Sequence, residues 1–306
     1  GYHKLNPSYE NEWYLLNQLT LDQTYQENLY EVAHGVSFSG EMGYTIGVRI
    51  NGKTTYYGAK GNSSGKVKVT APFFWSFNKN DQRRDLTFAN FDIREGDNGN
   101  TIETMQGNSP FGIYLAKWDP RKMTDKWLNA ARASADKVAT GINNVIMRYS
   151  DVLLLYAEAL NEVEGSYEIP SWNGETMYTI TRSATALKEG IQPIRIRAGL
   201  PDYEVYDDVK KFRFKVKRER QIELFAEGHR FFDIRRWCDA PVEEALPIYG
   251  CNIYLTSENP DSFHTPIEVA SLPTMFTTKM WFWPIHHNIM KRNMWMIQNP
   301  GWKDPE

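Results

Sequence analysis

Apolar side chains recur at the spacing of a helix in a segment that begins near Ile146, and this pattern constrains the fold more than any other part of the chain. Acidic residues occupy the other side of the pattern, and Gly165 stands where a helix C-cap belongs. We therefore predict an amphipathic helix that buries one face against other helices. The apolar positions are Tyr149, Val152, Leu153, Tyr156, Leu160 and Val163.

Two further segments have helical patterns that are less regular. The first covers residues 175–198 and is interrupted by Gly190 and Pro193. The second begins with one of residues 207–208 as N-cap and continues to about Gly228. Helices paired at this spacing predict a mainly α fold, in which helical hairpins form a scaffold with one irregular face.

The chain between residues 36 and 140 has a different texture. Residues 44–50 and 53–57 alternate in polarity around Asn51-Gly52, which is typical of a β-hairpin with a type I′ turn. The remainder of this region is rich in Gly, Asn, Asp and aromatic residues and predicts long irregular loops. We expect a helical scaffold that carries such loops and one small hairpin.

Composition excludes several classes of protein. The chain has 306 residues, of which 41% are hydrophobic and 24% charged, and no apolar run reaches the roughly 18 residues that span a bilayer. Its net charge of -3 provides no global basic field, so nucleic acid is not an expected partner. Two cysteines, Cys238 and Cys251, are too few for a disulfide framework, and either one bridge or two small buried side chains remains open.

One segment matches the pattern of a phosphate-binding loop, but the residues around it do not fit such a loop. Residues 47–54 fit the G-x-x-x-x-G-K-[ST] pattern of a phosphate-binding loop. Such a loop must open a helix whose free backbone amides hold the anion, whereas the residues after Thr54 are β-branched and aromatic. The hairpin interpretation explains the same residues, so we expect no nucleotide site.

Glu219, Glu223 and Glu227 are four residues apart on the third predicted helix and therefore share one face. A pair of them is a candidate acid and base for glycoside hydrolysis. Arginines surround them in sequence, which favours a structural ion-pair network, and ion pairing lowers a carboxyl pKa and disfavours a general acid. The six histidines lack metal-ligand spacing, and the sequence indicates no metal site and no cofactor.

Aromatic residues make up 14% of the chain, which is more than a core of this size ordinarily needs. Tyr44, Tyr56, Tyr57 and Trp75 lie beside Gly, Asn and Ser in the predicted hairpin and loops, where flat rings next to hydrogen-bonding groups suit sugars. We predict carbohydrate binding at these four residues; packing under long loops is the alternative for each ring. The same two alternatives apply to Trp118, Trp127, Trp172 and Trp237.

A run of basic residues on the third predicted helix has two interpretations, a polyanion site or a solvated helix face. Apolar residues interleave with the charges and spread them around the helix, which favours the solvated face. The basic residues are Lys210, Lys211, Arg213, Lys215, Lys217, Arg218 and Arg220.

Four segments together resemble the C-terminal region of a known family. They are residues 148–162 (RYSDVLLLYAEALNE), 195–201 (RIRAGLP) and 218–237 (RERQIELFAEGHRFFDIRRW), and Trp283-Pro284-Ile285 leading to residues 298–302 (QNPGW). An earlier Asp81-Gln82-Arg83-Arg84 fits the family's Asp-x-Arg-Arg element. In this order they are similar to the SusD/RagB family of Bacteroidetes outer-membrane nutrient-binding lipoproteins.

The resemblance implies a scaffold like that of tetratricopeptide repeats, with long loops that bind a glycan and pack on a SusC-like TonB-dependent transporter at the extracellular face of the outer membrane. It implies architectural motifs and no catalytic residues. Two alternatives remain, a glycoside hydrolase that uses Glu223 and Glu227 and a purely protein-binding helical scaffold.

The resemblance also implies a single unit over residues 1–306. Within it, residues 36–140 form the loop-rich face, residues 146–237 the helical core, and residues 238–306 a loop and the C-terminal tail. Family members are longer, and their lipidated N-terminal cysteine and first repeat helices have no counterpart in this sequence. The N-terminal repeat part, with the lipid anchor, is therefore expected to be missing.

Overall fold

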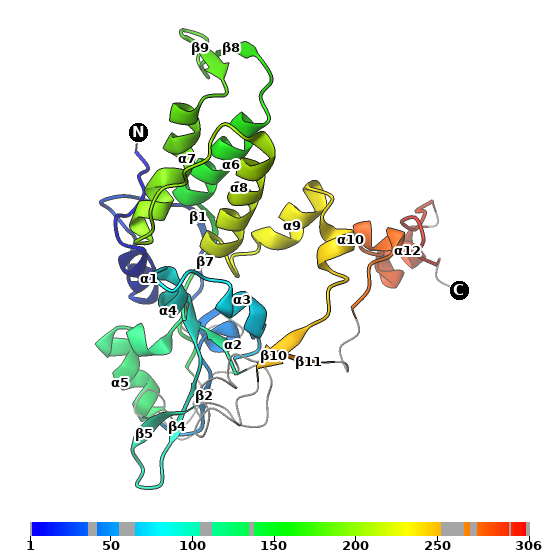
Figure 1. Cartoon of the computed structure of the whole chain (residues 1–306). Coiled ribbons are helices and arrows are strands. Elements are labelled where there is room, and N and C mark those ends of the chain that lie inside the picture. Colours follow the sequence, from blue (N-terminus) through cyan, green and yellow to red (C-terminus); the bar gives the residue numbers. More distant parts are fainter. Residues whose placement is uncertain are drawn as a thin grey trace.

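The structure is a computed structural model, and it describes residues 2–35, 42–54, 65–104, 112–134, 138–251, 266–269, 274–293 and 295–303. Figure 1 shows a bundle of three helices in the upper half, a lower half of short helices and small sheets, and a C-terminal segment that leads away to one side. The bundle helices are α6 (Tyr149–Asn161), α7 (Ala184–Arg197) and α8 (Val209–Glu223). The C-terminal segment contains α9 (His229–Arg236), α10 (Ala240–Glu243), β10 (Tyr249–Cys251), β11 (Pro266–Glu268), the 3-10 helix η3 (Thr278–Trp281) and α12 (His287–Arg292).

The bundle confirms the mainly α prediction. Helix α6 lies where its periodicity indicates, and α8 begins after Asp208, whose side chain accepts a hydrogen bond from the backbone N–H of Lys211. One hydrophobic core joins the three helices, so burial of apolar faces holds the bundle together. Its buried residues include Leu154, Ala157, Leu160, Leu187, Ile191, Ile194, Phe212 and Val216.

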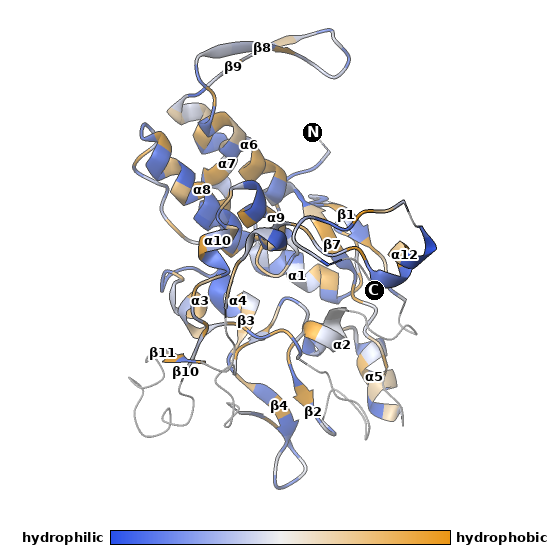
Figure 2. Ribbon diagram, turned by 90° about the vertical axis from the view of Figure 1, so that its right-hand side faces the viewer, coloured by the Kyte–Doolittle hydropathy of each residue, from blue (hydrophilic) through white to orange (hydrophobic). Residues whose placement is uncertain are grey.

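The predicted start of α7 at residue 175 is wrong. The chain first forms an antiparallel hairpin of β8 (Ser166–Pro170) and β9 (Met177–Thr181), which projects beyond the bundle in Figures 1 and 2. Gly174 has a φ of +72° at its turn, a conformation that glycine adopts without strain. The β9 sequence Met-Tyr-Thr-Ile-Thr is rich in β-branched and aromatic residues, which favour a strand.

Gly190 does not interrupt α7 but allows it to approach α6 closely. A Cβ at this position would lie 2.6 Å from the carbonyl oxygen of Leu153 and 2.8 Å from the Cβ of Ala157. Both distances are shorter than van der Waals contact, so only glycine fits this crossing. The helix also continues through Pro193, the second residue that the sequence marks as a break.

The lower half combines short helices with two- and three-stranded sheets around a second core. Strand β1 pairs antiparallel with β7, β3 pairs with β6, and β2, β4 and β5 form a three-stranded sheet. The buried rings of Trp13 and Trp118 meet edge to face in this core, with centroids 5.6 Å apart. The strands are β1 (Asn28–Val32), β2 (Ile50–Asn51), β3 (Phe88–Ala89), β4 (Asp92–Glu95), β5 (Thr101–Thr104), β6 (Tyr114–Leu115) and β7 (Asn144–Arg148). The helices are α1 (Tyr9–Asn17), α2 (Met42–Ile46), α3 (Ala71–Trp75), α4 (Arg83–Thr87), the 3-10 helix η1 (Pro120–Lys122) and α5 (Asp125–Ala133).

The hairpin predicted around Asn51-Gly52 is wrong in its first strand. Residues 42–46 form α2, and β2 pairs in parallel with β4 instead of with the residues that follow it. Long-range contacts override the local pattern: the N–H of Val48 donates to the carbonyl of Trp118, and a Cβ on Gly47 would lie 2.1 Å from the same oxygen. Residues 55–57, the predicted second strand, lie outside the described residues.

Candidate functional site

The carboxylates that the sequence offers for hydrolysis lie in a buried group of charges, which we call the central cluster. Its members come from α7, from α8 and the residues just after it, from the junction of β7 with α6, and from distant segments of the lower half. Side-chain exposure is close to zero throughout. The members are Glu27, Asp81, Arg83, Lys117, Arg148, Arg197, Glu219, Glu223 and Glu227.

Glu223 lies at the centre of this cluster and is 0% exposed. Its carboxylate accepts hydrogen bonds from Arg83 at 3.0 Å, Arg148 at 3.0 Å and Arg197 at 2.5 Å. Burial alone would raise the pKa of Glu223, but these three guanidinium groups hold it well below the usual range. The carboxylate is therefore permanently ionised and closed to solvent.

Glu227 is held in the same way by Arg148, at 2.7 Å, and by the Lys117 ammonium, also at 2.7 Å. Burial opposes ionisation, yet these two cations lower the pKa of its carboxyl. Neither Glu223 nor Glu227 is a proton donor near neutral pH, and both side chains are enclosed, with exposures of 0% and 1%. This geometry confirms the ion-pair network and speaks against the hydrolase alternative.

The tail motif is also architectural. The Gln298 side chain accepts from the N–H of Ile285 at 2.7 Å and donates to its carbonyl at 3.0 Å. The Asn299 amide donates to the carbonyl of Trp283 at 2.7 Å, and the Trp283 ring stacks on Phe231 of α9 with centroids 5.8 Å apart. These contacts close the tail into a loop and attach it to α9.

The four residues predicted to bind carbohydrate lie in different settings. Tyr44 belongs to α2, and its side chain is outside the described residues, as are Tyr56 and Tyr57 altogether. Trp75 is the last residue of α3 and is partly buried. Figure 2 shows α2 and α3 on either side of β3, so the structure does not bring these two helices together.

The remaining rings separate into core and surface. Phe73, two residues before Trp75, stacks on Phe225 with centroids 4.6 Å apart and packs against the lower core. Trp118 and Trp127 are buried in that core, so of the two alternatives for these rings, packing is the correct one. Trp172 is 97% exposed in the turn of the β8–β9 hairpin.

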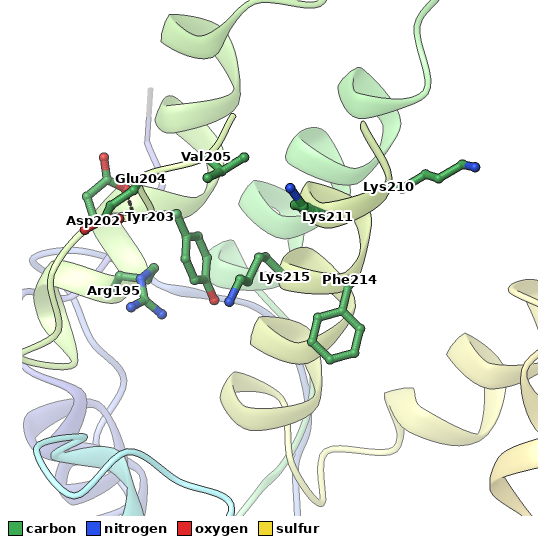
Figure 3. Close-up of a pocket in the computed structure, with 9 residues that line it drawn as sticks. All are labelled: Arg195, Asp202, Tyr203, Glu204, Val205, Lys210, Lys211, Phe214 and Lys215. Carbon is green, nitrogen blue, oxygen red and sulfur yellow. Dashed lines mark hydrogen bonds between the residues drawn. The ribbon is translucent and has the colours of Figure 1, made fainter. Parts of the chain in front are cut away.

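A surface groove, the α8 groove, lies between α8 and residues 202–205, which connect α7 to α8 (Figure 3). It has a volume of about 750 Å³ and is open to solvent. Rings, basic groups and carboxylates line it together, which is the mixture that ligand sites for polar molecules use. The lining residues are Arg195, Asp202, Tyr203, Glu204, Val205, Lys210, Lys211, Phe214 and Lys215.

Tyr203 forms the fixed wall of the α8 groove. Its ring lies 3.9 Å from the Arg195 guanidinium and 5.3 Å from the Lys215 ammonium, and Figure 3 shows it between the two. Its hydroxyl donates to Glu219 of the central cluster at 3.0 Å. Burial and the neighbouring Glu219 carboxylate raise the pKa of Tyr203 above the ordinary value for tyrosine, so the hydroxyl stays protonated.

Phe214 and Lys210 form the solvated rim of the α8 groove. Phe214 is 67% exposed on a helix rich in Lys and Arg. Lys210 points away from Tyr203 in Figure 3. The sequence placed Lys210 in the basic run, with Phe214 among its charges, and favoured a solvated face because apolar residues spread the charges around the helix. The opposite wall of the groove, at residues 202–205, has no periodic pattern that would have revealed it.

The structure offers no metal site in the parts of the chain that it describes, where no group of three or more His, Cys, Asp or Glu side chains converges. Cys238 is an exposed free thiol, and the Cys251 side chain lies outside the described residues. His286 has a structural role, because it is the N-cap of α12 and its ring accepts a hydrogen bond from the N–H of Asn288 at 3.2 Å.

Comparison with known proteins adds a curated relative and several solved structures. SusD-like protein P38 of Formosa agariphila is 32% identical over 109 residues, which are 35% of this chain and 19% of that protein. A SusD homologue from Bacteroides thetaiotaomicron superposes with a TM-score of 0.67 at 24% identity, covering 99% of this chain and 56% of the other. Surface glycan-binding protein A from the same organism, solved with laminarihexaose, gives a TM-score of 0.60 at 15% identity, covering 97% and 56%.

These identities show a shared fold, and the chain spans little more than half the length of the solved structures. The motifs that the sequence shares with the family are the ones that build the central cluster and the tail loop. The model of the SusD family matches residues 10–302, almost the entire chain. This chain therefore belongs to the SusD/RagB family.

Proposed function

We propose that this chain is a non-enzymatic glycan-binding protein of the cell surface. One observation carries the proposal: the family match over residues 10–302 joins this chain to a fold in which a surface glycan-binding protein was solved with laminarihexaose. The central cluster supports the non-enzymatic part, because its carboxylates are ion-paired and enclosed.

The α8 groove is the described surface that best fits a sugar. A pyranose ring has a flat apolar face and a rim of hydroxyl groups, and the groove offers exposed Phe214 beside charged hydrogen-bonding side chains. Tyr44, Tyr56, Tyr57 and Trp75 remain our proposed second set of glycan contacts. A Trp75→Ala variant that binds every glycan as tightly as the wild type would remove Trp75 from that set.

We further propose delivery of the bound oligosaccharide to a SusC-like TonB-dependent transporter at the outer membrane. The β8–β9 hairpin supports a protein contact, since it projects from the bundle and exposes Tyr167, Ile169, Trp172 and Tyr178. Within the described residues, no helix has the length and apolar character needed to cross a membrane. Co-purification of the transporter with the wild type, and its loss with Trp172→Ala, would support this assignment.

Native gels that contain plant, host or fungal polysaccharides test the proposed function. We expect one class of glycan to retard the chain, with no reducing sugar released after prolonged incubation. Reducing sugar that appears with the wild type and disappears with Glu223→Gln, in a variant that is still folded, would instead establish the hydrolase. Failure of every glycan, with a membrane partner that still co-purifies, would favour the protein-binding scaffold.

A further inference from the structure

A second groove continues the α8 groove along the same helix. It has a volume of about 620 Å³, and it shares Lys210 and Phe214 with the first. The two grooves therefore meet at one exposed ring and one exposed ammonium group. The second groove is lined by Lys210, Arg213, Phe214, Lys217, Arg218, Gln221, Arg230, Asp239, Glu243 and Leu246.

The joined surface, which we call the α8 cleft, carries more basic than acidic groups. Eight basic residues line it against four acidic ones. The chain as a whole carries a net charge of -3, so this excess is a local feature and not a consequence of composition. A concave surface with an excess of one sign attracts ligands of the opposite sign, because low-dielectric walls focus the field.

Several basic residues of the α8 cleft have carboxylate partners of their own. Lys217 lies 2.7 Å from Asp239, and Arg195 lies 3.1 Å from Glu219. Lys210 and Lys215 differ, since neither has a carboxylate within ion-pair distance among the residues that the structure describes. Both are exposed, and although the Lys215 ammonium also lies 5.3 Å from the Tyr203 ring, two positive charges without a carboxylate partner are available to a ligand.

Phe214 adds an apolar platform between these charges. Exposure of 67% leaves most of its ring free for stacking. The 15 residues of α8 extend about 22 Å at about 1.5 Å per residue, so the cleft follows a length greater than one sugar ring. An elongated ligand with both rings and negative charges matches this arrangement better than a neutral one.

We propose that the α8 cleft binds acidic glycans, meaning oligosaccharides that carry carboxylate or sulfate groups. Lys210 and Lys215 contact the anionic groups, and Phe214 stacks on a sugar ring. This inference rests on the proposed glycan-binding function and adds the chemical class of its ligand.

Matched pairs of polysaccharides in native affinity gels test the charge requirement. The pairs are polygalacturonate with its fully methyl-esterified form, and a sulfated carrageenan with its desulfated form. We expect retardation by at least one acidic polysaccharide, loss of that retardation with its neutral partner, and a steep weakening as salt rises. The pair that responds identifies carboxylate or sulfate as the anionic group.

Substitutions locate the site. The double variant Lys210→Gln/Lys215→Gln should weaken binding to the acidic polysaccharide about tenfold, and Phe214→Ala should weaken it as well. Lys126→Gln, on the exposed side of α5, is the matched control for loss of a surface charge and should leave binding unchanged. Lys210, Lys215 and Phe214 are exposed, as is the control residue Lys126, so the thermal unfolding midpoint of each variant should stay at the wild-type value.

The outcomes separate this inference from the proposed function. Retardation by neutral glycans alone, or equal retardation by both members of each pair, overturns the inference and leaves glycan binding in place. Unchanged affinity in the double variant also overturns it. Absence of retardation by every glycan removes the proposed function as well, and equal binding of single-stranded DNA through the same lysines would show a general polyanion surface instead of a glycan site.

Discussion

Both faces of α8 carry charged side chains, but those on one face are buried and ion-paired and those on the other are exposed. On one face, Glu219 and Glu223 are enclosed by guanidinium groups and close to zero exposure. On the other, Lys210 and Lys215 stand in solvent beside an exposed phenylalanine. The two sets of charged side chains differ in burial and in the number of ion-pair partners. A charged residue in the sequence therefore does not by itself indicate a binding function.

Burial makes the inner face intolerant of change. Moving charges out of water is costly, and the cost is offset only when every charge keeps its partners. Glu223 contacts three guanidinium groups at once, so its removal leaves several buried positive charges without compensation. The outer face has no such dependence, because water already solvates its ammonium groups.

The largest expected effect is that of Glu223→Gln. Loss of the central negative charge should lower the free energy of unfolding by about 3–5 kcal/mol, as measured by urea denaturation at pH 7. Glu164→Gln makes the same chemical change at an exposed position and should stay within about 0.5 kcal/mol of the wild type. Similar stability of the two variants would show that the central cluster is not structural.

Low pH should remove the stabilisation that the ionised Glu223 carboxylate provides. The folded-state pKa of Glu223 lies below its ordinary value of 4.5, so ionisation favours the folded state above that pH and the advantage is lost as pH falls below it. Between pH 5 and pH 3, the free energy of unfolding should therefore fall more steeply for the wild type than for Glu223→Gln. Parallel curves would contradict the assigned pKa direction.

A steric change in the bundle should have an intermediate effect. Gly190→Ala places a Cβ 2.6 Å from the Leu153 carbonyl oxygen, so α6 and α7 must separate, at a cost of about 1–3 kcal/mol. Thr185→Ala on the exposed side of α7 is the control and should be near neutral. A Gly190→Ala variant more stable than the wild type would show that the crossing can relax.

The smallest expected effect comes from an ion pair on the outer side of α8. Arg213 binds Glu162 of the α6 C-cap, but both side chains are well exposed. Arg213→Gln should change the free energy of unfolding by less than about 1 kcal/mol in thermal or chemical denaturation. A loss as large as that of Glu223→Gln would remove the distinction between the two faces.

Local patterns in the sequence predicted much of the bundle. The periodicity of α6 and the Asp208 N-cap of α8 are signals carried by neighbouring residues, and both are confirmed. The helix predicted from residue 175 failed because a strand-forming hairpin precedes α7. The hairpin at Asn51-Gly52 failed because Trp118, far along the chain, fixes the backbone of residues 47–48.

The ion pairing of Glu219, Glu223 and Glu227 was predictable from the arginines around them in the sequence, but the identity of their partners was not. Several of the cations that bind them come from distant segments, such as Arg83 and Lys117, and distance in sequence conceals those contacts. The α8 groove was missed for the same reason, since its second wall is a loop. Only the folded chain places that loop beside Phe214.

The most direct test of the account measures stability and binding on the same two variants, at a temperature where both are folded. We predict that Glu223→Gln loses several kcal/mol of unfolding free energy and keeps its affinity for the acidic polysaccharide. We predict the reverse for Lys210→Gln/Lys215→Gln, with wild-type stability and about tenfold weaker binding. If both variants lose stability and affinity together, or if neither loses its expected property, the separation of structure and binding between the two faces of α8 is contradicted.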